Sequence, residues 1–402
     1  MTTGRAGSLE ALRRLNRLRV IHALRDQGLI SRAEIARRTG LSRSTVSSLV
    51  ADLQADGLVV ERGEPGEAHG TQGGRPPILL SFDSSAGAAV GIDFGHSHLR
   101  VAVSDLSSRI LAERAVPLDT DHAAEEGLDA AADLIVELLG EAGIDESQVI
   151  GAGMGLPGPI LQEDGIVGSS AILPGWVGVP AVAEMRRRLE VPILVDNDAN
   201  LGALAEAAFG AGQGATDLIY LKVASGIGAG LLLNGRLYRG TGGLAGELGH
   251  FLVDPSGLVC RCGNRGCLET LAATGALVEL LRRSQGEDMT VQRMLDLARE
   301  GDIGCRRVIA DAGRAIGRAV SMLINVLNPE LVVVGGDLAA AGDLLLDGVR
   351  ESIARAALPS AAEAAGVVTG VLEDRAQVLG AIALVISEAD RAFPTKLAAG
   401  AA

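Results

Sequence analysis

Residues Gly246–Glu269 read GELGHFLVDPSGLVCRCGNRGCLE and hold the most specific pattern in the chain. A single histidine, His250, precedes three closely spaced cysteines, Cys260, Cys262 and Cys267. One imidazole and three thiolates form a stable tetrahedral set for Zn²⁺, and the interposed glycines let one loop wrap the ion. No coordination position remains open, so the pattern predicts a structural zinc site. Buried or free thiols are the alternative.

Carboxylates lie on both sides of this loop and in a second segment. Glu247 precedes His250, and Glu269 follows the last cysteine. Residues 195–200 read VDNDAN and are expected at the end of a strand that leads into a helix, where α/β proteins bind ligands. Asp198 is a candidate general base toward a sugar hydroxyl, with Asn197 hydrogen-bonding its neighbour. A helix N-cap with a spare charge is the alternative.

Two glycine-rich turns are candidates for binding phosphate. Residues 93–98, DFGHSH, are expected in the turn of a hairpin, and residues 224–230, ASGIGAG, offer backbone N–H groups to an anion. Either segment could instead be an ordinary tight hairpin turn.

The first 80 residues have the pattern of a winged helix-turn-helix. A helical pattern covers Leu9–Gln27, Ser31 and Glu34 form a capping-box signature, and Ser42 caps a third helix to Asp56. Short strands are expected at residues 58–60 and 78–80, with a wing between them. Residues with short or basic side chains are expected to contact DNA: Ser42, Arg43, Ser44, Thr45, Ser47, and Arg75 at the base of the wing. A small helical capping domain is the alternative.

The length and the charge distribution of the chain agree with a separate DNA-binding domain in the first 80 residues. The chain has 402 residues and a formal net charge of −14. Residues 1–80 carry 12 arginines and 8 acidic residues, a balance of +4, so the remainder carries −18. A basic head on an acidic body is typical of a DNA-binding module joined to a sensor. With no long apolar run and no signal segment, we expect a cytoplasmic protein without membrane association.

From residue 88 onward, strand and helix patterns alternate. The strand patterns cover residues 89–94, 99–104, 149–155, 192–195, 218–224, 228–233 and 331–334, and the helical patterns cover 123–140, 199–208, 308–327 and 378–389. This alternation predicts an α/β body of two lobes with a cleft between them. We expect a DNA-binding domain at 1–82, a first lobe at 83–200 joined by a returning helix at 378–392, and a second lobe at 201–377. The second lobe carries the zinc loop and the oligomerisation helices.

Together these motifs resemble the ROK family of repressors, open reading frames and sugar kinases, from about Leu9 to Ala389. The resemblance implies the two-lobed actin-like, hexokinase-like ATPase fold. It also implies that Asp198 corresponds to the kinase base and that His250 serves both zinc and sugar. The residues that would hold the sugar are Asn197, Asp198, Glu247, His250 and Glu269. The winged head is similar to that of the family's xylose and N-acetylglucosamine repressors, and the kinases lack it.

One departure bears on activity. ROK kinases usually carry Asp-x-Gly-Gly-Thr in the first phosphate loop, whereas Asp93 and Gly95 are followed here by His96 and Ser97. In this loop the backbone must approach the phosphates closely, so the bulky imidazole of His96 should hinder ATP binding. The remaining nucleotide-side matches are Ser225, Gly226, Gly228, Gly335 and Gly336.

We therefore expect a sugar-responsive transcription regulator that is not an enzyme. It would be a homodimeric or homotetrameric repressor, released from a pseudo-palindromic operator by a monosaccharide or a sugar derivative. The main alternative is an active hexose kinase with an auxiliary DNA-binding head. A third possibility is a repressor that answers a protein or a phosphosugar.

Overall fold

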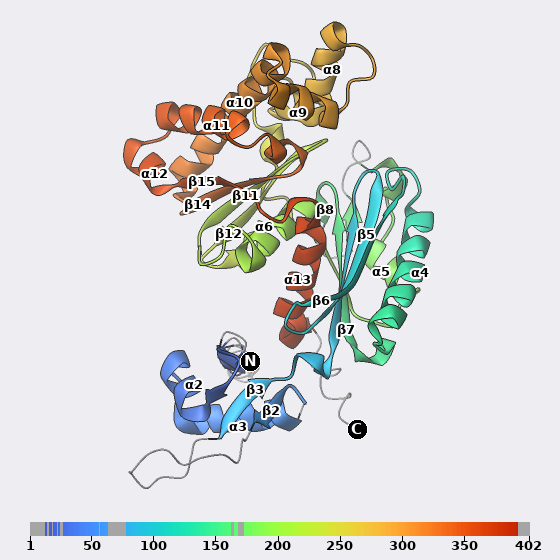
Figure 1. The fold of residues 1–402 in the computed structure, drawn as a ribbon, viewed down its shortest axis with the longest axis vertical. Coiled ribbons are helices and arrows are strands. Elements are labelled where there is room, and N and C mark those ends of the chain that lie inside the picture. Colours follow the sequence, from blue (N-terminus) through green and yellow to red (C-terminus); the bar gives the residue numbers. More distant parts are fainter. Residues whose placement is uncertain are drawn as a thin grey trace, which may run out of the picture.

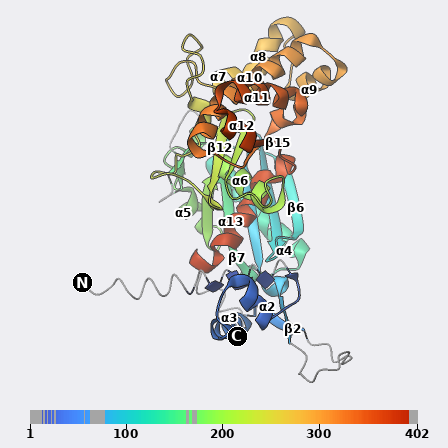
Figure 2. The same cartoon turned by 90° about the vertical axis from the view of Figure 1, so that its left-hand side faces the viewer.

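The computed structural model describes residues 27–55, 57–62, 78–161, 165–167 and 173–392, and scattered positions between 13 and 24. Three parts follow one another along the long axis of the molecule: a small helical head, a five-stranded sheet with helices on both faces, and a second five-stranded sheet (Figures 1 and 2). Within the described residues, no helix is long and apolar enough to span a membrane.

In the described part of the head, two helices lie on a small antiparallel sheet, and the described positions between 13 and 24 are also helical. The helices are α2 (Arg32–Thr39) and α3 (Arg43–Ala55), and the sheet has the order β1 (Ile30–Ser31), β3 (Leu79–Phe82), β2 (Val59–Arg62). The turn between the helices contains Gly40 in the left-handed conformation (φ 69°), which favours glycine. The inward residues of α3 are all buried: Val46, Leu49, Val50 and Leu53. This arrangement confirms the predicted winged helix-turn-helix, although most of the predicted first helix and wing lie outside the described residues.

The capping of α2 differs from the prediction. The Ser31 hydroxyl accepts a hydrogen bond from the Glu34 backbone N–H at 3.3 Å, as expected. The Glu34 carboxylate, however, accepts from Arg37 and Arg38 on the exposed surface. The arginines of the last turn thus attract the side chain that the capping box would have used.

The first sheet of the body has the order β10-β7-β4-β5-β6. Its strands are β4 (Ala88–Phe94), β5 (His98–Asp105), β6 (Ile110–Pro117), β7 (Val149–Leu156) and β10 (Ile193–Asn197). The neighbours β4, β7 and β10 are parallel, so their carboxyl ends meet at one edge. Helices α4 (Ala124–Ala142) and α5 (Ala181–Arg186) lie on one side of the sheet, and α13 (Ala376–Ala392) lies on the other (Figure 1).

Glycines allow α13 to lie close to this sheet. A Cβ atom on Gly91 would be 2.4 Å from the carbonyl oxygen of Val378, and one on Gly153 would be 2.3 Å from that of Ala381. Gly380 makes a similar approach to α6 (Asp198–Phe209), the helix that follows β10. The C-terminal helix is therefore packed between the first sheet and α6.

The second sheet has the order β13-β12-β11-β14-β15. Its strands are β11 (Leu218–Val223), β12 (Ile227–Leu233), β13 (Arg236–Leu237), β14 (Leu331–Gly335) and β15 (Gly366–Thr369). Alternate residues of β11 face opposite sides. Leu218 and Tyr220 pack toward α6, whereas Ile219 and Leu221 belong to the core shared with α10 (Ile303–Leu327) and α11 (Asp343–Ala356).

Several further elements were not predicted. They are the strands β1, β6, β13 and β15, the short pair β8 (Ile160–Leu161) and β9 (Ile166–Val167), and the helices α5, α7 (Glu269–Ala272), α8 (Thr274–Gln285), α9 (Val291–Glu300), α11 and α12 (Pro359–Ala364). The predicted boundary at residue 200 falls inside α6. That helix begins at the end of a first-sheet strand and packs against β11 and β12 of the second sheet.

Candidate functional site

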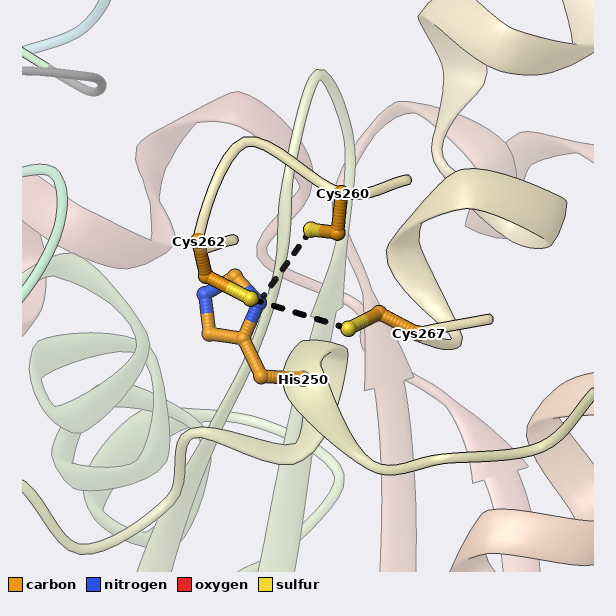
Figure 3. A group of neighbouring side chains, drawn as sticks. All are labelled: His250, Cys260, Cys262 and Cys267. Carbon is orange, nitrogen blue, oxygen red and sulfur yellow. Dashed lines mark hydrogen bonds between the residues drawn. The ribbon is translucent and has the colours of Figure 1, made fainter. Parts of the chain in front are cut away.

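The predicted metal ligands come together in the loop between β13 and α7. The ligand atoms of His250, Cys260, Cys262 and Cys267 all lie within 4.8 Å of one another (Figure 3). His250 Nδ1 is 3.6 Å from Cys260 Sγ, and the Sγ atoms of Cys262 and Cys267 are 3.7 Å apart. Tetrahedral Zn²⁺ with its usual bond lengths separates neighbouring ligand atoms by roughly 3.5–3.8 Å. The cluster therefore has the size and donor set that zinc requires.

The shape of this loop requires a glycine at position 266. Gly266 has φ +73°, and a Cβ atom there would lie 1.6 Å from the carbonyl oxygen of Asp254. Its neighbour Cys267 is fully buried. Burial raises the pKa of the Cys267 thiol to about 12. A thiol with that pKa is protonated at neutral pH, and a bound zinc ion would replace its proton.

The two ring nitrogens of His250 face different groups. Nδ1 faces the cysteines, and Nε2 lies 3.7 Å from a Glu247 carboxylate oxygen. A metal on Nδ1 would leave the proton on Nε2, where it can be donated to Glu247 or to a ligand.

All five residues predicted to hold a sugar line one pocket. They are Asn197, Asp198, Glu247, His250 and Glu269. Asn197 and Asp198 come from the end of β10 and the start of α6. On the far side of the cleft, His250 belongs to the metal cluster, and Glu247 and Glu269 lie on either side of it in the sequence. Asn197 is the N-cap of α6: its Oδ1 accepts from the backbone of Ala199 and Asn200, and its Nδ2 donates to Gly158 O at 2.8 Å. The side-chain oxygen of Asn197 therefore caps α6, as the alternative interpretation of this segment, a helix N-cap, expected.

Asp198 is bound by a residue that sequence reasoning missed. The ammonium of Lys222, on β11, donates to Asp198 Oδ2 at 2.6 Å, and Asp198 Oδ1 accepts from the Ala199 backbone at 2.7 Å. Burial alone would lower the pKa of Lys222, but the carboxylates of Asp198 and Asp93 outweigh it and raise that pKa. Lys222 is therefore charged, and it neutralises the candidate base.

Glu269 also has a cationic partner that was not predicted. The guanidinium of Arg261, between two of the cysteines, donates to both Glu269 oxygens at 2.7 and 2.8 Å. Among the residues that the structure describes, Glu247 has no lysine or arginine partner; its neighbour is the imidazole of His250, at 3.7 Å. Burial and the nearby carboxylates of Asp198 and Glu269 raise the pKa of Glu247 to about 7. Near neutral pH this carboxyl can both donate to and accept from a hydroxyl.

A second, larger cavity of about 760 Å³ adjoins the first. Five of the predicted nucleotide-side residues line it: Asp93, Gly95, Ser225, Gly335 and Gly336. Gly226 and Gly228 instead line the first pocket, together with Ser225. Both cavities therefore meet at the turn between β11 and β12.

Two histidines lie in the first candidate phosphate-binding turn, residues 93–98. The prediction placed the obstruction at His96, whose Nδ1 is hydrogen-bonded to Asp121 at 2.7 Å. The ring of His98 lies against Gly95 so closely that a Cβ there would be 2.1 Å from its Cε1 atom. His98 Nε2 also lies 3.1 Å from Asp93 Oδ2. The imidazole next to the loop backbone is thus His98, which sequence reasoning did not single out.

Two sequence signals could have found the missed cations. Lys222 interrupts the apolar strand LIYLKV, and a buried lysine requires a carboxylate partner. Arg261 lies between two metal-ligand cysteines, close to Glu269 in the sequence. Neither signal names the partner, because that depends on which strands and loops face each other.

The predicted DNA-contact residues cluster at the start of α3. Ser42, Arg43, Ser44 and Ser47 are exposed, and Thr45 is half-buried. The Ser42 hydroxyl accepts from the Thr45 backbone at 3.1 Å, as the predicted cap requires. Arg75 lies outside the described residues.

Comparison with known proteins agrees with this architecture. The profile of the ROK family matches residues 89–388, and that of the MarR family matches residues 14–68. The chain belongs to the ROK family. Among its ROK relatives, the xylose repressor of Caldicellulosiruptor bescii is 34% identical over 95% of this chain and 98% of the repressor.

Solved ROK structures match the chain to two different extents. A ROK transcriptional regulator, described as a homolog of the Escherichia coli MLC protein, has a TM-score of 0.83 with 25% identity and covers 96% of this chain and 99% of its own. A ROK glucokinase from Streptomyces griseus, solved with glucose and AMPPNP, has a TM-score of 0.64 with 30% identity and covers 74% of this chain and 99% of its own. About a quarter of this ROK chain therefore has no counterpart in the glucokinase.

Proposed function

We propose that this protein is a sugar-responsive transcription repressor that leaves its operator when a monosaccharide or sugar derivative binds. The observation that carries the proposal is the winged helix-turn-helix head, with an exposed polar start to α3, on a ROK body. The similarity to a xylose repressor over nearly the whole of both chains supports it.

The sugar would bind in the pocket that contains Asn197, Asp198, Glu247, His250 and Glu269. Carboxylates, an amide and an imidazole are the groups that hold several hydroxyls at once. Residues from two sides of the cleft contribute to this pocket, so a sugar would favour one arrangement of the sides over another. Such a difference in affinity is what a ligand needs to change DNA binding.

Zinc in the His250 cluster would act structurally. The four ligands leave no position for a substrate, and the loop they close carries Glu247 and Glu269. Zinc would therefore hold two sugar-binding carboxyls in place without taking part in chemistry.

We do not assign a kinase activity to this site. The large second cavity and Asp198 favour the alternative of a hexose kinase with a DNA-binding head. Against it, Lys222 holds the Asp198 oxygen that would take a proton, and His98 lies on the phosphate loop. Sugar-stimulated ATP consumption would decide for the kinase.

The assembly would be a homodimer or homotetramer on a pseudo-palindromic operator, in the cytoplasm. Two symmetric heads match two half-sites one or more helical turns apart. The contacts to DNA would come from Ser42, Arg43, Ser44, Thr45, Ser47 and Arg75.

The test is fluorescence anisotropy with the DNA upstream of the protein's own gene, with and without pentoses, hexoses and their phosphates. Tight, salt-sensitive binding relieved by one sugar is expected. Asp198→Asn should blunt that relief and leave operator binding intact, whereas Asp347→Asn, on the exposed face of α11, should change neither. Operator binding that no sugar or phosphosugar affects would contradict the proposed effector class.

A further inference from the structure

The Lys222 side chain lies where the two cavities meet. Asp198 lines only the first pocket and Asp93 only the second, whereas Lys222 lines both. Asp93 is on β4 and Asp198 directly follows β10, and these two strands lie on either side of β7. Their carboxylates therefore stand at the same edge of the first sheet, and Lys222 reaches them from β11 of the second sheet.

Lys222 forms an ion pair with Asp198 and interacts electrostatically with Asp93 at longer range. Lys222 Nζ is 2.6 Å from Asp198 Oδ2, and both acids are almost fully buried. The Asp93 carboxylate also stabilises the charged form of Lys222, as the raised pKa of the lysine indicates. His98 is a further titratable group next to Asp93, with Nε2 3.1 Å from Oδ2. Without the lysine, two buried carboxylates would share a site with no fixed cation.

Carboxylate oxygens in such a position are the ligands that divalent cations prefer. Phosphoryl transfer from a nucleotide requires a divalent cation and a carboxylate free to orient or deprotonate the acceptor hydroxyl. The Lys222 ammonium works against both conditions, because it already binds an Asp198 oxygen and its positive charge repels a second cation near Asp93.

We propose that Lys222 is a fixed internal cation that occupies the position between Asp93 and Asp198 where a divalent metal ion would otherwise bind. The pocket thereby binds sugar without metal or nucleotide. This inference rests on the proposed sugar-receptor function and specifies how the kinase-like site is converted to binding alone. Its immediate consequence is that removing the lysine charge creates a metal site.

The experiment measures Mn²⁺ binding to the full-length, zinc-loaded protein by the loss of the free-ion electron paramagnetic resonance signal. Four proteins are compared: wild type, Lys222→Met, Lys222→Arg, and Lys222→Met combined with Asp93→Asn. Methionine keeps a long apolar stem without the charge, and arginine keeps the charge. Far-UV circular dichroism and thermal unfolding establish that each variant is folded.

Lys222→Met should bind Mn²⁺ at least about tenfold more tightly than wild type, because an unpaired buried carboxylate pair gains strongly from a counter-ion. Mg²⁺ should compete for this site. Lys222→Arg and the double variant should behave like wild type. A folded Lys222→Met protein with wild-type Mn²⁺ affinity would overturn the proposal.

Wild-type protein that binds Mn²⁺ through Asp93 would also overturn the proposal. If Lys222→Met does not fold, Lys222→Gln, which can still donate to Asp198, takes its place with the same expected results. Because Mn²⁺ binding is read without sugar or DNA, failure here is distinguishable from failure of the repressor function.

Discussion

Replacing Arg261 by alanine tests whether the Arg261–Glu269 pair holds the sugar pocket together. Two charge-assisted hydrogen bonds, of 2.7 and 2.8 Å, would be lost, and the Glu269 side chain, only 9% exposed, would keep a charge without a partner. Breaking a fully buried pair costs about 3–5 kcal/mol, and an exposed pair contributes about 0–1 kcal/mol. The Arg261 side chain is 33% exposed, so this pair lies between the buried and the exposed case. We therefore expect the free energy of unfolding to fall by about 2 kcal/mol.

Arg265→Ala is the matched control in the same loop. Arg265 is exposed and its charged guanidinium donates one hydrogen bond, to the neutral Gly257 O at 2.8 Å; because water can replace that bond, its loss should cost about 0.5–1 kcal/mol. Urea denaturation followed by far-UV circular dichroism gives both free energies of unfolding, and zinc content is measured in parallel. Zinc should stay bound in both variants, and only Arg261→Ala should weaken the sugar response.

If the free energies of unfolding of Arg261→Ala and Arg265→Ala differ by less than about 0.5 kcal/mol, the reasoning is refuted. A difference that small is within the scatter found between independent sites. It would mean that solvent compensates Glu269 in the folded protein as well as Arg261 does.

Three other changes test the metal cluster, the head and the packing of α13. Cys262→Ser should release zinc and lower the melting temperature, whereas Cys305→Ser, at a buried thiol outside the cluster, should leave the zinc content unchanged. Arg43→Ala should weaken operator binding and make its salt dependence shallower; unchanged affinity would remove this residue from the interface. Gly153→Ala should cost about 1–3 kcal/mol, because the added methyl meets the backbone of α13. Gly140→Ala, where the methyl meets nothing within 4 Å, should be neutral or stabilising, and equal melting temperatures would contradict the packing argument.

Much of the site could be predicted because its determinants are close together in the sequence. The four metal ligands fall within one short segment, and their chemistry requires a common ion wherever that segment lies. The cap of α3 and the turn at Gly40 likewise depend on residues a few positions apart. Apolar strands flanked by glycine made most of β4, β7, β11 and β14 recognisable. The edge strand β6 was missed because its charged and half-exposed residues hide the strand pattern.

By itself, the sequence determined the division into a winged head and an α/β body, the zinc-type ligand set and the identity of the carboxylates that line the pocket. Only the tertiary structure decided which cations meet these carboxylates. The contact between Lys222 and Asp198 joins two different sheets, and the position of His98 over Gly95 depends on how one hairpin turns. Charge pairing across a cleft depends on distances between elements that pack independently of local sequence. Local patterns therefore revealed the groups in the pocket, and packing decided which of them remain free to act.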